Sequence, residues 1–146
     1  MGVARRIIAA ALLSGVALVA TATPAFADNG DRTVTTNCTP ATWQSPATGA
    51  AHARITSCKI LWGKNIIDGS YWQTVTVVWV DSMTDGDCAD LIVSNPVQTS
   101  PEQQECSGVP KTYKVSYTQR DAWIKVDLSH GLKDRVAHTT TAPSGY

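Results

Sequence analysis

Four closely spaced aspartates are the residues of this chain whose type and spacing most directly suggest chemistry. They are Asp81, Asp85, Asp87 and Asp90, with Gly86 between the middle pair. Ca²⁺ is usually bound by several carboxylate oxygens on a flexible loop. The spacing differs from that of an EF-hand loop, which closes with a glutamate at its twelfth position. We therefore interpret the run as the solvated end of a hairpin that turns at Asp85-Gly86. Calcium is the alternative, and we predict no metal and no cofactor.

The residues that usually carry catalysis are few and dispersed. The two glutamates, Glu102 and Glu105, lie three residues apart in one polar segment. A glycosidase instead needs two carboxyl groups that face each other across a cleft. The histidines, His52, His130 and His138, are scattered, and no Gly-x-Ser-x-Gly or His-Glu-x-x-His motif accompanies them. We interpret both glutamates as solvated charges and predict that the protein is not an enzyme.

The cysteines predict two disulfide bonds. Four cysteines are present, Cys38, Cys58, Cys88 and Cys106. In an exported chain an even number of cysteines forms disulfides rather than catalytic thiols, and four allow three pairings. We predict Cys38–Cys58 and Cys88–Cys106, because each closes a local loop beside a predicted strand. In the chain-entropy model, a disulfide that closes a loop of about 20 residues stabilises the folded state by about 3 kcal/mol.

Residues 1–27 are predicted to be a secretory signal peptide. Arg5 and Arg6 precede an uncharged apolar run over residues 7–20, and Ala25-Phe26-Ala27 has the small-x-small pattern of a cleavage site. The run is shorter than the ~20 residues that a membrane-spanning helix needs. We therefore expect a secreted, extracellular protein with no membrane attachment after the signal is removed.

The charge of the remaining chain excludes some classes of partner. Without Arg5 and Arg6 it has 10 basic residues against 12 acidic ones, a net charge of −2, and no basic cluster. Nucleic acids and anionic membranes attract proteins with basic surfaces. We therefore predict neither as a partner.

Residues 71–81 are predicted to be the central strand around which the domain is built. The segment is rich in valine, threonine and aromatic residues, which favour strands, and it carries no charge before Asp81. Both of its faces are largely apolar, so we expect cover on both faces. A second predicted strand, 54–62, would pair with it in a hairpin. We assign Trp62, Trp72 and Trp79 to the core.

The segment 112–128 alternates apolar and polar residues and predicts a second hairpin, with its turn at Arg120-Asp121. The expected apolar pairs are Tyr117 with Ile124, Val115 with Val126, and Tyr113 with Leu128. On the opposite face Lys114 would meet Asp127, beside Lys125 and Trp123. A tryptophan exposed on a flat, polar sheet face suits stacking on a sugar or anchoring a protein. These four residues are our candidate partner-binding site.

Short strands separated by turns indicate an all-β fold, a small antiparallel β-sandwich, immunoglobulin-like or related, with a small β-barrel as the alternative. We place one domain at residues 28–138, with a turn at Ser129-His130-Gly131 and a last strand from Asp134. A flexible polar tail, 139–146, would follow. The predicted function is non-catalytic binding of an extracellular protein, as an inhibitor or an adaptor subunit. A long loop at residues 94–110, pinned by Cys106, could hold a recognition segment rigid. The alternative is a carbohydrate-binding or cell-wall-binding module.

Overall fold

The protein is all-β in the computed structural model, which describes residues 30–132 and 134–146. The predicted signal peptide, 1–27, lies outside the described residues. Within these described ranges nine strands follow one another: β1 (Asp31–Asn37), β2 (Trp43–Ser45), β3 (Ala53–Asn65), β4 (Tyr71–Asp81), β5 (Ala89–Ser94), β6 (Gln103–Glu105), β7 (Lys111–Tyr117), β8 (Trp123–His130) and β9 (Asp134–Thr141). Among these residues no helix is long and apolar enough to cross a membrane.

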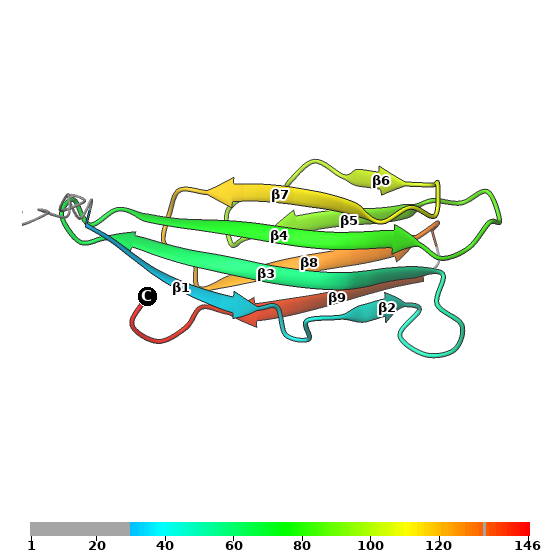
Figure 1. Ribbon diagram of the computed structural model, residues 1–146, viewed down its shortest axis with the longest axis horizontal. Helices are drawn as coiled ribbons and strands as arrows, with labels where there is room; N and C mark the ends of the chain where they lie inside the picture. Colours follow the sequence, from blue (N-terminus) through cyan, green and yellow to red (C-terminus); the bar gives the residue numbers. More distant parts are fainter. Residues whose placement is uncertain (1–29, 133) are drawn as a thin grey trace, which may run out of the picture.

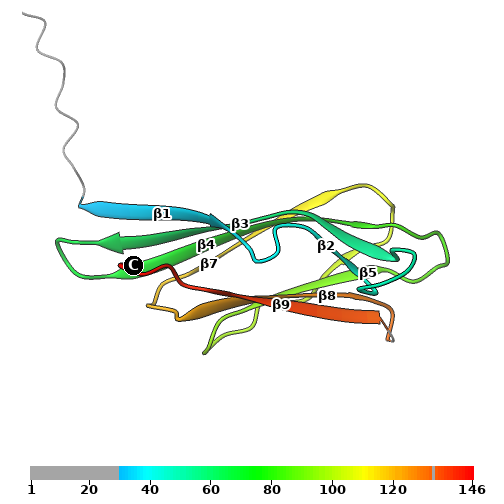
Figure 2. The same ribbon diagram turned by 90° about the horizontal axis from the view of Figure 1, so that it is seen from below.

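The strands form two antiparallel sheets that face each other (Figures 1 and 2). The first contains β1, β3, β4 and β7 in that order, and β2 also pairs with β3. The second has the order β6, β5, β8, β9. The prediction of a small β-sandwich with two disulfides is therefore confirmed.

Strand β4 lies between β3 and β7 and supplies much of the core, as predicted. Burial alternates along it: Val75, Val77 and Trp79 are buried toward the second sheet. Their neighbours on the opposite face, Trp72 among them, are half-buried. Within the described chain no element covers that face, as Figure 2 shows. The expected cover on both faces is therefore wrong, and so is the assignment of Trp72 to the core.

The predicted hairpin over residues 112–128 does not form. Its two halves are β7 and β8, which belong to different sheets. Val115 lies opposite Val75 of β4, while Val126 lies opposite Val93 of β5. The turn expected at Arg120-Asp121 is instead a crossover between the sheets. There the buried carboxylate of Asp121 accepts hydrogen bonds from the side chains of Asn95, at 2.8 Å, and Gln119, at 3.0 Å.

Both predicted disulfides are present. Cys38–Cys58 joins the segment after β1 to β3, and Cys88–Cys106 joins the residue before β5 to the residue after β6. Among the described residues no cysteine is free. Such crosslinks are typical of an oxidising, extracellular type of environment.

The end of the chain is more ordered than its composition predicts. Strand β9 runs to Thr141, so the domain boundary predicted after His138 falls inside a strand. Tyr146 is buried, and its ring packs edge-on against Trp62 and Tyr71. The prediction of a flexible tail beginning at Thr139 is wrong, because residues 139–141 pair with β8 and Tyr146 packs on the core.

Glu105 is a buried structural residue rather than a solvated charge. It ends β6 and has no exposed surface. Its carboxylate accepts hydrogen bonds from the backbone amides of Asp81, at 2.9 Å, Ser107, at 2.6 Å, and Gly108, at 3.2 Å, and from the Ser107 hydroxyl. The interpretation of Glu105 as a loop charge is therefore wrong. One carboxylate ties the end of the first sheet to the edge of the second.

Candidate functional site

One end of the sandwich brings together histidines and aspartates from four separate segments. The start of β3 lies opposite the end of β4, where Ala53 pairs with Asp81. In the second sheet the end of β8 lies beside the start of β9 and the start of β5, where His130 pairs with Asp134 and Ala89. The antiparallel pairing therefore places the residue before β3, the β4–β5 loop, the end of β8 and the start of β9 around one space.

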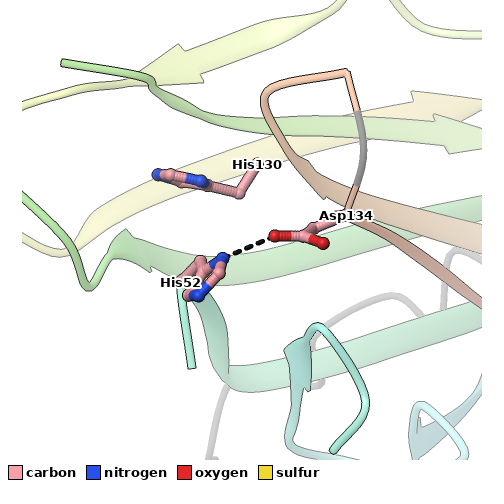
Figure 3. A group of neighbouring side chains, drawn as sticks. All are labelled: His52, His130 and Asp134. Atoms are coloured by element: carbon pink, nitrogen blue, oxygen red, sulfur yellow. Dashed lines mark hydrogen bonds and ion pairs between the residues drawn. The ribbon is translucent and has the colours of Figure 1, made fainter. Parts of the chain in front are cut away.

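His52 and Asp134 meet directly in this space, with His130 next to them (Figure 3). The Nδ1 atom of His52 lies 2.5 Å from Oδ2 of Asp134. The rings of His52 and His130 are edge-to-face, with their centroids 5.5 Å apart. Each of the three residues offers one ligand atom, and these atoms all lie within 4.8 Å of one another. Three such atoms could hold one metal ion.

His130 is the least solvated member of the cluster. Only 3 % of the residue is exposed, and its Nε2 atom is buried without a hydrogen-bond partner. The nearest carboxylate oxygens are those of Asp81, at 3.3 Å, and Asp85, at 3.5 Å, and neither contact has hydrogen-bond geometry. A buried polar atom that makes no hydrogen bond destabilises the fold. This nitrogen, next to the carboxylates of Asp81 and Asp85, is therefore a candidate metal ligand.

The acidic β4–β5 loop forms the other wall of the space. Oδ1 of Asp85 accepts a hydrogen bond from the backbone amide of Asp87, at 3.1 Å. The carboxylate of Asp87 packs over Gly131, where a Cβ atom would come within 2.9 Å of it. Asp85, Asp87 and His130 make up a second group with metal-ligand spacing. Both groups line one pocket of about 360 Å³, with Leu132 at its rim.

The predicted calcium ligands are only partly brought together. Asp85 and Asp87 line the pocket, and buried Asp81 lies behind it against His130. Asp90 alternates with the buried residues of β5 and therefore projects from the outer face of the second sheet. Its burial raises the pKa of its carboxyl group. An all-oxygen calcium shell from the four aspartates is not what the structure assembles.

The observed donor set fits a transition metal better than calcium. Imidazole nitrogens suit Zn²⁺, Cu²⁺, Ni²⁺ and Fe²⁺, whereas Ca²⁺ takes oxygen ligands. Two histidines and one carboxylate, with a fourth position open to the pocket, are a common zinc arrangement. Tetrahedral Zn–N and Zn–O bonds of about 2.1 Å separate the ligand atoms by about 3.4 Å. Metal binding would therefore replace the His52–Asp134 hydrogen bond and increase the distance between Nδ1 of His52 and Oδ2 of Asp134 by about 1 Å.

The predicted partner-binding site is divided between the two sheets. Trp123, Lys125 and Asp127 lie on the outer face of β8, whereas Lys114 lies on the outer face of β7 in the other sheet. Asp127 is ion-paired with Arg135, whose Nε atom lies 2.8 Å from Oδ1. The expected Lys114–Asp127 pair is therefore wrong. Trp123 is half-buried on its strand.

Sequence reasoning missed His52, His130 and Asp134 as a group. His52 and Asp134 are 82 positions apart and meet only through the pairing of whole strands. A local signal existed for His130 and Asp134, which are close in the chain. A turn at Ser129-His130-Gly131 followed by a strand from Asp134 is a hairpin, and its first pair is His130 with Asp134.

No family model, curated protein or solved structure matches this chain.

Proposed function

We propose that the protein is an exported, non-catalytic binding domain whose best-fitting ligand is a divalent transition-metal ion. His52, His130 and Asp134 would hold the ion. The observation that carries this proposal is that His52, His130 and Asp134 each bring one ligand atom within 4.8 Å of the others. The cation would also offset the charge of the surrounding aspartates, which repel one another in its absence. Export is supported by the two disulfides and by the signal-like composition of residues 1–27.

Zinc is the metal to test first. Copper and nickel also favour imidazole, and copper exceeds zinc in intrinsic affinity at most sites, so a metal series is part of the test. Three protein ligands leave one position open to the pocket, unlike the closed shells of structural zinc sites. This openness supports reversible binding of the ion.

Addition of ZnCl₂ to the purified protein is expected to raise its melting temperature. A ligand that binds only the folded state stabilises it by about 2.7 kcal/mol at 100 times its Kd. His130→Ala and His52→Ala are each expected to weaken zinc binding, measured by titration calorimetry, by at least about 100-fold. Loss of an outer-shell partner alone commonly costs 10–100-fold, and these residues would be direct ligands.

The matched control is His138→Ala, because His138 packs edge-to-face against Trp43 and lies outside both metal-ligand groups. It should bind zinc like the wild type. An unchanged melting temperature with zinc, copper and nickel would show that the proposal is wrong. Zinc binding that His130→Ala and His138→Ala weaken equally would also contradict the assignment.

A second candidate is the predicted binding of an extracellular protein, as an inhibitor or adaptor subunit. It is favoured by two valines exposed between β5 and β7, Val97 at 72 % and Val109 at 60 %. The Cys88–Cys106 bond crosslinks the same region. The double variant Val97→Ser/Val109→Ser should lose a stoichiometric partner captured from culture supernatant. Ile67→Ser, 75 % exposed in the β3–β4 loop, should retain it. Capture of no stoichiometric protein by the wild type would count against this candidate.

A further inference from the structure

The outer face of the first sheet is an open surface of hydroxyl groups, lysines and one aromatic ring. We call it the threonine face, and the strand register arranges it in three rows. The first row is Thr33, Gly63 and Trp72; the second is Thr35, Leu61, Thr74 and Ser116; the third is Asn37, Lys59, Thr76 and Lys114. Among the described residues no strand packs on this face (Figure 2). It lies on the side of the sheet away from the core.

Trp72 lies flat on this face because Gly63 has no side chain. A Cβ atom built on Gly63 would come within 2.1 Å of Cε2, 2.5 Å of Cζ2 and 2.6 Å of Cδ2 of Trp72. Three atoms of the indole at such distances require the ring to rest against the backbone of β3. The other side of the ring is then turned to solvent, consistent with the half-buried state of Trp72. The result is a flat aromatic platform set on a rigid sheet.

Within these three rows the charged side chains have one sign. Lys59 and Lys114 are exposed and flank Thr76 in the third row, on strands two apart. Their Cα atoms are therefore about 9.5 Å apart. None of the residues in the three rows is acidic. Around the lysines stand the hydroxyls of the threonines and Ser116, and Thr74 and Ser116 are hydrogen-bonded at 2.9 Å.

We infer that the threonine face binds an acidic polysaccharide built from uronic acid residues. The apolar C–H face of a pyranose ring would stack on Trp72, which offers a large, rigid ring at little entropic cost. Carboxylates on neighbouring sugar residues would pair with Lys59 and Lys114. Hydroxyl side chains suit the many hydroxyls of a sugar chain, whereas protein interfaces are depleted in lysine and serine and bury apolar clusters, which this face lacks. The ligand should be negatively charged, because no acidic residue in the three rows offsets the charge of Lys59 and Lys114.

The test is the mobility of the full protein in native gels that contain polygalacturonate, with a chelator present throughout. The chelator keeps this result independent of the proposed metal site. Retardation of the wild type is expected, and Trp72→Ala should weaken it at least about tenfold, as for an aromatic hot spot. The double variant Lys59→Gln/Lys114→Gln should weaken it similarly. Its residual binding should also depend less on salt, because two ion pairs are lost.

The second sheet provides the matched control, since Trp123 and Lys125 occupy its outer face. Trp123→Ala and Lys125→Gln should bind polygalacturonate like the wild type. Equal retardation by neutral dextran would overturn the choice of an acidic ligand. Equal retardation by poly(glycerol phosphate), which carries charge without a sugar ring, would overturn the stacking role of Trp72. Unchanged binding in the lysine variant, whose exposed side chains are not needed for folding, would overturn the proposal as a whole.

Discussion

Replacement of Glu105 by glutamine is expected to lower the free energy of unfolding by about 3 kcal/mol at neutral pH. Burial of this carboxylate raises its pKa. Hydrogen bonds from the Ser107 side chain and from the backbone amides of Asp81, Ser107 and Gly108 lower the pKa by more than burial raises it, to about 2, against 4.5 for an ordinary glutamate. Glutamine has nearly the same shape but no charge, and its amide group would face donors.

The pH range of the effect follows from the direction of the shift. A carboxyl group with a lower pKa in the folded state stabilises the fold fully at pH values above 4.5, its pKa when unfolded. This stabilisation is lost as the pH falls from 4.5 toward the folded value of about 2. The difference in stability between wild type and Glu105→Gln should therefore be largest at neutral pH and shrink over this interval.

Urea unfolding at pH 7 and at pH 2.5 measures the prediction directly. Glu102→Gln is the control, because Glu102 is exposed and lies three residues before Glu105 in the chain. This substitution should change the free energy of unfolding by no more than about 0.5 kcal/mol at either pH. A cost for Glu105→Gln that is the same at both pH values would show that the charge is not what the surrounding donors stabilise.

The strands at the centre of the first sheet were predictable because burial in a sheet has a period of two. Strand β4 has the predicted bounds, and β3 contains the predicted 54–62 segment with Cys58, Ile60 and Trp62 on its buried face. The disulfides followed from the same local reasoning, since the paired cysteines are only 20 and 18 positions apart in the chain. Local pattern and short separation were sufficient for these features.

Strand pairing was less predictable, because an alternating strand matches any other alternating strand. The apolar residues of β7 could pair with those of β8 as well as with those of β4, and local sequence favours the nearer partner. What separates β7 from β8 is the crossover at Asp121, whose buried carboxylate needs Asn95 from another loop. Such a requirement becomes visible only in three dimensions.

The candidate site and Glu105 were missed for a related reason. Each depends on contacts between segments that are distant in the chain, such as His52 with Asp134, 82 positions apart, and Glu105 with Asp81, 24 positions apart. A single histidine or glutamate in a polar segment has no local feature that distinguishes a ligand or buried acceptor from a solvated charge. The pairing of strand ends supplies that information.

Trp62→Ala is expected to be the most destabilising single substitution of the core, at about 3–5 kcal/mol. The side chain has no exposed surface and is the largest of the fully buried ones. Its Nε1 atom donates a hydrogen bond to the Thr36 hydroxyl, at 2.9 Å, and its ring packs edge-on against Tyr146, with centroids 5.0 Å apart. Alanine would leave a cavity in the core and remove the contact that supports the ring of Tyr146.

The contact with Tyr146 makes this prediction a test of the order seen at residues 142–146. If Tyr146 is packed on Trp62, the costs of Trp62→Ala and Tyr146→Ala should not add in the double variant. Aromatic pairs in contact give coupling energies of about 0.5–1.5 kcal/mol, which chemical unfolding of the four proteins would resolve. Trp62→Phe, which keeps a ring but loses the hydrogen bond to Thr36, should retain most of the coupling. Strict additivity would mean that Tyr146 does not pack on the core in solution, and a flexible tail, as its composition predicts, would then be the better description.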